Sequence, residues 1–296
     1  MESLSMKQSN RNSIFKEDTV ILEHLHLEGD QHILKLNAPE ISSKASPGSF
    51  VHVECGPQFT LRRPISIMRA NRNSKTIELL YKKLGRGTSA LSEMESGESL
   101  SLLGPIGTPF QPHPERSRPL LIGGGVGMPP MVFIAESLYN DKRYSPFAIL
   151  GSEVPFPFKV TPSQMIIPGI PDGVIGSMPL LEDWGIPCRL ASLQGYPGTH
   201  EGYVTELARH WLNALSEDER SQVEIFGCGP HPMLEAVASL ASEYNIPCQI
   251  SLEEFMACGV GGCAGCVVQV ETPNGPAMKR VCVDGPVFEA NTIFGC

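Results

Sequence analysis

Four cysteines near the C-terminus have the spacing of an iron–sulfur site. They follow the pattern C-x4-C-x2-C, and the last thiol comes after fifteen further residues. Four glycines separate the first three thiols, so the loop can wrap around a small inorganic core and direct backbone N–H groups at its sulfides. The pattern predicts electron transfer through a [2Fe-2S] cluster with four thiolate ligands, Cys258, Cys263, Cys266 and Cys282.

Two other uses of these cysteines compete with the cluster. A four-thiolate zinc site usually has two C-x2-4-C knuckles, whereas the last cysteine here stands alone. Disulfides would suit an exported protein, but no other feature of the chain indicates export. The five other cysteines are scattered without a disulfide framework, at Cys55, Cys188, Cys228, Cys248 and Cys296.

A glycine-rich turn, LIGGGVGMPPM, lies between an expected strand and an expected helix. Such a turn allows a pyrophosphate to bind backbone N–H groups at the start of the helix. It departs from G-x-G-x-x-G because Pro130 stands at the third glycine position, and a tight connection without a ligand would have the same composition. The candidate nucleotide residues of this turn are Gly123, Gly124, Gly125 and Gly127.

Three shorter motifs could also contact a cofactor. RPIS, with Arg63, Pro64, Ile65 and Ser66, offers a guanidinium for a diphosphate and a hydroxyl for a ring edge. Gly87 and Thr88 precede a short helical run at Ser89 to Met94 and could bind a second phosphate, or could simply form a capped turn. Cys228 ends a strand at the carboxyl edge of a sheet, where it is either near a flat ring or a small buried apolar residue.

The order of apolar runs predicts two domains and a small third module. Six short alternating runs favour an antiparallel β-barrel at residues 18–113, after a loose tail at residues 1–17. Alternating strands and helices then predict a parallel α/β domain at residues 114–250. The boundary between the two domains falls within the proline-rich segment 111–119. Residues 251–296 are too few for a core of their own and form the cysteine module.

Composition excludes several classes of function. The net charge of −9 disfavours nucleic acid or an anionic membrane as partner, and no apolar run is long enough to span a bilayer. The N-terminal residues have no apolar signal core, so we expect a soluble cytoplasmic protein. The sequence has no nucleophile elbow and no helical histidine pair, so we expect neither a catalytic side chain nor a histidine ligand.

These motifs in this order resemble those of the ferredoxin-reductase-like flavoproteins, and specifically the electron transfer subunits of class 1B dihydroorotate dehydrogenases. The resemblance covers residues 18–290 and implies a barrel that binds FAD, an α/β domain that binds NAD, and a C-terminal [2Fe-2S] module. It implies FAD contacts from the RPIS residues, from Gly87 and Thr88, and from Leu80, Tyr81 and Lys82. It places the glycine turn by the pyridine nucleotide and Cys228 near the nicotinamide.

The resemblance also implies a partner and a reaction. A catalytic subunit that contains FMN would oxidise dihydroorotate, in a heterotetramer with two copies of each subunit, and this chain would pass the electrons to NAD+ in pyrimidine biosynthesis. One alternative is a diaphorase-type subunit of a ferredoxin:NADP transhydrogenase or a sulfhydrogenase. Another is a zinc-stabilised binding module without redox function. The N-terminal extension and the segment from Val154 to Pro179 have no role that the motifs assign.

Overall fold

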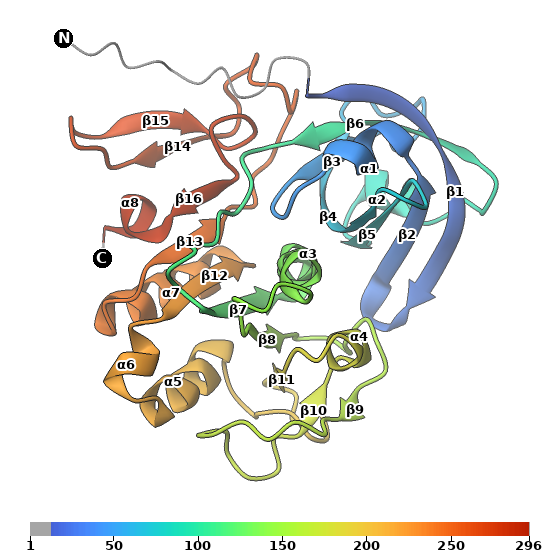
Figure 1. Ribbon diagram of the computed structural model, residues 1–296. Coiled ribbons are helices and arrows are strands. Elements are labelled where there is room, and N and C mark those ends of the chain that lie inside the picture. Colours follow the sequence, from blue (N-terminus) through green and yellow to red (C-terminus); the bar gives the residue numbers. More distant parts are fainter. Residues whose placement is uncertain (1–12, 296) are drawn as a thin grey trace.

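Six antiparallel strands close into a barrel in the N-terminal part of the chain (Figure 1). The structure is a computed structural model, and it describes residues 13–295. The strands follow the order β1-β2-β5-β4-β3-β6 around the barrel, as the six alternating runs predicted. Their bounds are β1 Phe15–Leu27, β2 Gln31–Asn37, β3 Phe50–Val53, β4 Arg63–Asn71, β5 Thr76–Lys82 and β6 Ser99–Ile106.

Alternation along the strands fills the barrel with aliphatic side chains. Leu34 and Leu36 of β2, Ile67 of β4 and Leu102 of β6 are completely buried in this core. Short helices connect the strands: η1 (Glu28–Asp30), α1 (Pro39–Lys44) and α2 (Arg86–Leu91).

Two boundaries in this half differ from those expected from the sequence. Strand β1 begins at Phe15, within the expected tail, because it pairs with β6 from that residue onward. Residues 1–12 of the tail lie outside the described residues. Helix α2 begins three residues before the expected run at Ser89, since the hydroxyl of Thr88 accepts hydrogen bonds from the backbone N–H groups of Leu84 and Gly85.

A six-stranded sheet forms the second half of the molecule (Figure 1). Its order is β11-β8-β7-β12-β13-β16, and every neighbouring pair is parallel except β13 with β16. The bounds are β7 Arg118–Gly124, β8 Phe147–Gly151, β11 Cys188–Ala191, β12 Val223–Cys228, β13 Cys248–Ser251 and β16 Val287–Glu289. A separate two-stranded sheet is formed by β9 (Thr161–Pro162) and β10 (Gly176–Ser177).

Helices cover both faces of this sheet. Leu120 and Ile122 of β7 pack with α5 and α7, whereas Leu121 packs with α3 and α4 on the other face. Strands buried on both faces are largely apolar, which explains their short apolar runs, although β12 also buries Glu224. The helices and the turn before them are η2 (Gly125–Gly127), α3 (Met128–Leu138), α4 (Pro179–Asp183), α5 (Val204–Ala214), α6 (Glu217–Arg220) and α7 (His231–Glu243).

The C-terminal module is joined to the α/β sheet. After the cysteine loop come the hairpin β14 (Val267–Val270) and β15 (Ala277–Arg280), then β16 and α8 (Ala290–Phe294). Val281 and Cys282 share one hydrophobic core with Ile250 and Leu252, at and just beyond β13. The module therefore obtains its core from the neighbouring sheet rather than from its own few residues.

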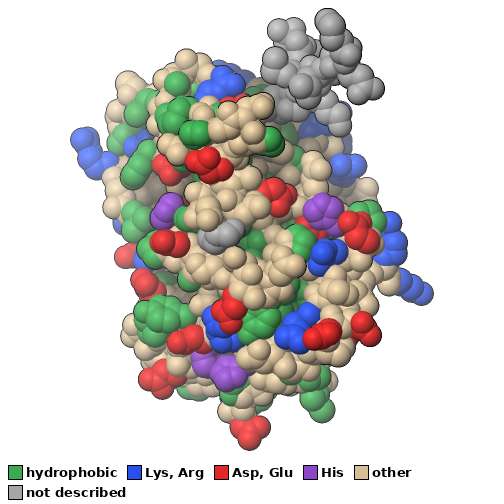
Figure 2. All heavy atoms as spheres, turned by 90° about the vertical axis from the view of Figure 1, so that its left-hand side faces the viewer, with side chains coloured by type: hydrophobic (Ala, Val, Ile, Leu, Met, Phe, Trp, Pro, Cys, Tyr) green, Lys and Arg blue, Asp and Glu red, His purple; other side chains and the backbone are tan. Residues whose placement is uncertain are grey.

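The two large parts contact each other through side chains as well as through the chain itself. Arg69 of β4 forms an ion pair with Glu136 of α3 at 2.7 Å. At the tip of the β1–β2 hairpin, the Gln31 side-chain amide donates to the carbonyl oxygen of Pro155 at 2.7 Å. On the face shown in Figure 2, the described acidic and basic side chains are interspersed. No helix within residues 13–295 is long and apolar enough to cross a membrane.

Candidate functional site

Backbone N–H groups point at all four predicted cluster cysteines, and the N–H of Gly261 is the one that serves Cys282. In the loop after β13, the N–H of Val260 donates to the sulfur of Cys258 at 3.5 Å, and the N–H of Gly265 donates to the sulfur of Cys263 at 3.4 Å. The N–H of Cys282 donates to the sulfur of Cys266 at 3.5 Å. The loop thus presents positive backbone dipoles to its thiols, as an environment for thiolates or sulfides requires.

The four thiols form two hydrogen-bonded pairs, Cys258 with Cys263 and Cys266 with Cys282. Burial acts to raise the pKa of Cys258, but the N–H groups of Val260 and Cys263 and the Cys263 thiol outweigh it and lower the pKa to about 7. Burial and the neighbouring Cys266 thiol raise the pKa of Cys282 to about 12. One pair is therefore close to the surface and the other is buried.

This pairing bears on the kind of metal that the loop could hold. A single ion requires all of its ligand atoms around one point, within about 4 Å of one another for sulfur ligands. Among residues 13–295, the one group of three or more potential ligand atoms that lies within 4.8 Å of one another consists of barrel histidines. Each thiol pair could serve one metal position of a binuclear cluster, and the two pairs adjoin each other because Cys258 also acts on Cys282.

The cysteine loop contacts the barrel beside the RPIS strand. Gly259 has a φ of +67°, and a Cβ added there would lie 2.8 Å from the Nδ1 atom of His52. His52 is buried on β3 and is paired with Pro64 of β4. Only His52 therefore separates Gly259 of the cysteine loop from the RPIS strand.

The RPIS motif and the Gly87–Thr88 turn meet at one end of the barrel. The guanidinium of Arg63 lies so close to Gly87 that an added Cβ would be 2.9 Å from its Nε atom. Arg63 donates to the carbonyl oxygens of Leu61 and Arg62, while the Thr88 hydroxyl donates to Gly85 within its own turn. The turn therefore has the capped geometry that the sequence allowed as an alternative to a phosphate site, and the Arg63 guanidinium is the charged group beside it.

Strand alternation divides the barrel candidates between two faces. Ile65 and Tyr81 point into the barrel core, whereas Ser66 lies on the partly exposed outer face of β4. Leu80 packs outward against Met128 and Met131 of α3. The Tyr81 hydroxyl bonds to His24, so Tyr81 can contact an outer-face ligand only through its backbone.

The glycine turn and Cys228 lie together at the carboxyl edge of the sheet. Strands β7 and β12 are parallel neighbours in which Gly123 is paired with Cys228. A Cβ added to Gly127 would lie 2.3 Å from the carbonyl oxygen of Cys228, so only glycine allows this approach. Turn η2 also contacts β5, which brings this edge to the outer face of the barrel.

Glu253 is a candidate that the motifs did not reveal. It follows β13, and the thiol of Cys228 lies 4.0 Å from its Oε1 atom. Although Glu253 reaches solvent, desolvation by the surrounding protein raises the pKa of its carboxyl. Burial and then the Glu253 charge raise the pKa of the Cys228 thiol. The signal available in the sequence was its position just beyond a strand end, but β13 itself was not predicted.

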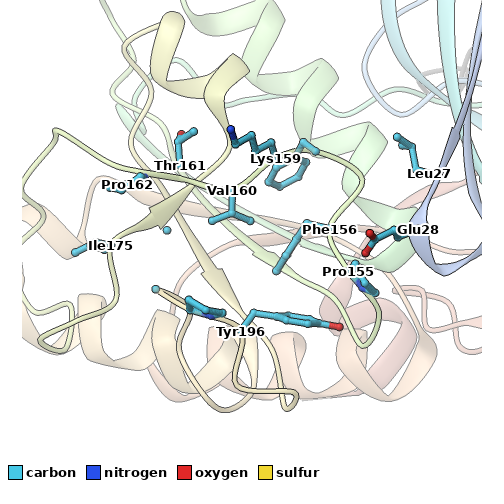
Figure 3. A pocket seen from close by; sticks show the side chains of 14 residues that line it. Leu27, Glu28, Pro155, Phe156, Lys159, Val160, Thr161, Pro162, Ile175 and Tyr196 are labelled. Carbon is cyan, nitrogen blue, oxygen red and sulfur yellow. The ribbon is translucent and has the colours of Figure 1, made fainter.

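A cavity of about 690 Å³ lies farther along the same edge, between the loops that follow β8 and β11 (Figure 3). Phe156 and Tyr196 line it with ring centroids 6.2 Å apart, and Lys159 adds a positive charge. The segment from Val154 to Pro179, which had no role from sequence, supplies much of this wall.

Comparisons with known proteins agree with this arrangement. Residues 253–294 match the family model of the iron-sulfur cluster binding domain of dihydroorotate dehydrogenase B. The dihydroorotate dehydrogenase B (NAD(+)) electron transfer subunit of Geobacillus sp. (strain WCH70) is 32% identical over 283 residues, covering 94% of this chain and 98% of that protein. The subunit of the same name from Caldanaerobacter subterraneus subsp. tengcongensis is 34% identical, covering 85% and 88%.

Solved structures share the fold. An NADH-dependent reduced ferredoxin-NADP oxidoreductase structure has a TM-score of 0.72 at 23% identity, covering 93% of this chain and 89% of that one. The ferredoxin reductase in carbazole 1,9a-dioxygenase has a TM-score of 0.61 at 20% identity, covering 79% and 67%. Barrel, sheet and cysteine loop together define a ferredoxin-reductase-like protein with an iron–sulfur module. Within that class, the chain belongs to the electron transfer subunits of dihydroorotate dehydrogenase B.

Proposed function

We propose that this subunit passes electrons from a catalytic subunit that oxidises dihydroorotate to NAD+, by means of bound FAD and a [2Fe-2S] cluster. The observation that carries the proposal is the iron–sulfur family match over residues 253–294, on a loop that contacts the barrel next to the RPIS strand. The cluster ligands are the two thiol pairs, Cys258 with Cys263 and Cys266 with Cys282. The family match over this loop supports an iron–sulfur cluster over zinc.

FAD occupies the outer face of the barrel in this proposal. The Arg63 guanidinium pairs with the diphosphate, and Ser66 faces the ring from the outer side of β4. The buried side chains of Ile65 and Tyr81 leave only their backbone for contact. The full set of FAD residues is Arg63, Pro64, Ile65, Ser66, Leu80, Tyr81, Lys82, Gly87 and Thr88.

NAD binds across the carboxyl edge of the sheet, as ligands do in open α/β folds. The pyrophosphate lies at the glycine turn, Gly123, Gly124, Gly125 and Gly127, and the nicotinamide lies near Cys228. Strand order supports the direction of the nucleotide, because β8 and β11, whose loops line the aromatic cavity, lie on the opposite side of β7 from β12. The adenosine end therefore occupies the cavity between Phe156 and Tyr196.

Side chains position the reactants rather than acting as a general base. FAD supplies the conversion between hydride transfer with nicotinamide and single-electron transfer with an iron–sulfur cluster. Glu253 lies just beyond β13 beside the buried Cys228 thiol, at the edge of the sheet where the nicotinamide is placed in this proposal.

The catalytic subunit, which contains FMN, docks over the cysteine loop, in a heterotetramer of two subunits of each kind. Phe255 is 96% exposed and Val260 is 49% exposed, although both are apolar residues within five positions of Cys258. Cys263 is also exposed. Apolar side chains held in solvent beside a redox site are typical of a surface that a partner covers.

An anaerobic preparation tests the proposal. Iron, acid-labile sulfide and flavin are quantified, and the expected contents per chain are two iron, two sulfide and one FAD. Mixing with the catalytic subunit should then give dihydroorotate-dependent reduction of NAD+. A colourless protein that contains zinc would refute the cofactor assignment. A coloured protein that reduces NAD+ only with reduced ferredoxin would instead support a diaphorase-type subunit.

A further inference from the structure

Three histidines converge at one end of the barrel. The β1–β2 register is irregular after Ile21, and beyond this point His26 is paired directly with His32 across the hairpin. The ring centroids of His26 and His32 are 4.8 Å apart, and those of His24 and His26 are 4.5 Å apart. One potential ligand nitrogen from each of the three rings lies within 4.8 Å of the others.

His24 is held in the tautomer that a metal ligand needs. Its Nδ1 atom lies 2.7 Å from the carbonyl oxygen of Met94, which can only accept, so the Nδ1–H donates to it. The Nε2 atom therefore carries a lone pair, which accepts from the Tyr81 hydroxyl at 3.0 Å, and a bound ion would replace this hydrogen bond. A hydrogen bond from the other ring nitrogen to a backbone carbonyl is the usual support of a metal-bound histidine.

His32 has a buried nitrogen with nothing to bind. The residue is 5% exposed, and its Nδ1 atom has no hydrogen-bond partner among residues 13–295. Its ring stacks on Tyr81 with centroids 5.0 Å apart and an interplanar angle of 16°, which fixes its orientation. A buried polar atom without a partner is unfavourable, and a bound ion would satisfy it.

The charge state of the group suits ligation. Burial and then the neighbouring His26 and His24 lower the pKa of His32 to about 4, and burial lowers that of His24. Lys83 also acts to lower the pKa of His32, and Asp30 acts to raise it. Two of the imidazoles are thus neutral at physiological pH, as metal binding requires.

We propose that His24, His26 and His32 form a binding site for a divalent transition-metal ion of the Zn²⁺ class, separate from the cysteine loop. Imidazole nitrogens select such ions over Mg²⁺ and Ca²⁺, which prefer oxygen ligands. Nitrogens about 2.0–2.1 Å from one ion lie roughly 3.3 Å from one another, so the group closes by about 1.5 Å on binding. His26 is exposed at the barrel end, where it can make this movement and leave an entry path for the ion.

Zinc titration of the cofactor-loaded protein by calorimetry tests the site. We expect one Zn²⁺ per chain, and we expect His26→Ala to weaken its binding by at least about tenfold, the smallest effect of losing even an outer partner of a metal ligand. His210→Ala is the matched control, because His210 is an exposed histidine on α5 outside the group. Melting temperatures of both variants should equal that of the unaltered protein, since neither ring belongs to a core.

Cobalt identifies the ligands in the same protein. A site of three histidines gives weak d–d absorption without the thiolate-to-metal charge-transfer band that cysteine ligands produce. The proposal is overturned if the unaltered chain binds no zinc, if His26→Ala binds as tightly as His210→Ala, or if the cobalt spectrum shows thiolate ligation. None of these outcomes depends on the presence of NAD activity, so the inference stands or falls independently of the proposed function.

Discussion

Replacing Gly127 with alanine tests whether the close approach between the glycine turn and the end of β12 sets the nucleotide site. The added Cβ would lie 2.3 Å from the carbonyl oxygen of Cys228 and 2.5 Å from the nitrogen of Gly229. Ordinary contact begins at 3.4 Å, and backbone atoms cannot rotate away, so the turn must move by about 1 Å. We expect a loss of about 1–3 kcal/mol in unfolding free energy from overpacking. A 1 Å displacement at a reacting centre costs about 100-fold in rate.

The assay is stopped-flow reduction of the bound flavin by NADH, with urea unfolding measured on the same preparations. Gly185→Ala, outside the glycine turn, is the matched control: a Cβ there meets nothing within 4 Å, but the residue has a φ of +71°. That variant should lose about 1–2 kcal/mol through left-handed backbone strain and keep most of its rate. Equal rates in the two variants would refute the reasoning, because strain alone would then explain both.

Three further predictions concern the cluster, the flavin and pH. Cys263→Ser should remove the cluster iron and sulfide but leave flavin bound, because Cys263 lies on an exposed loop. Joint loss of flavin and of the cooperative melting transition would contradict the view that the cysteine loop and the flavin site are independent. Arg63→Ala should weaken FAD binding by about 1.5–3 kcal/mol, the value of a charge-assisted hydrogen bond, and Arg63→Lys should have an intermediate effect. Fluorescence titration of the apoprotein with FAD measures the affinity. An unchanged affinity would show that Arg63 does not bind the diphosphate. The hydrogen bond to buried Glu224 raises the pKa of His113 above its value in the unfolded chain. The stabilisation that protonated His113 provides is therefore complete below about pH 6.5, and it is lost as pH rises through the raised pKa. Urea unfolding should show this decline in the unaltered chain and not in His113→Gln, and parallel curves would disprove it.

Most strands could be predicted because each is a local pattern. The six barrel runs alternate between apolar and polar residues, and β7 and β12 are mostly apolar, with Arg118 at the start of β7 and Glu224 inside β12, so their positions follow from the local pattern. Strand β13 was missed because four residues, Cys248–Ser251, carry too short a pattern and coincide with the expected domain boundary. Strand β16 was missed because its pairing with β13 spans the whole cysteine loop, and such non-local pairing leaves no mark on neighbouring residues.

The candidate sites divide in the same way. Cysteine spacing and glycine turns are local, and they predicted residues that the fold brings together, such as Gly123 beside Cys228 and Arg63 beside Gly87. The histidine group depends on the register of β1 and β2 and on the irregularity after Ile21, so the spacing of the histidines in the sequence could not predict it. The position of Glu253 depends in turn on β13, whose end places the carboxyl beside Cys228.

Strand β16 also determines the order in which the molecule can be completed. A ribosome releases the chain from its N-terminus, so β13 waits with one open edge until Val287–Glu289 emerges. By then every cysteine from Cys258 to Cys282 has already been synthesised. An exposed β edge invites pairing with other chains. The free edge of β13 is therefore covered during the same interval of synthesis in which the thiols become available to an iron–sulfur delivery system.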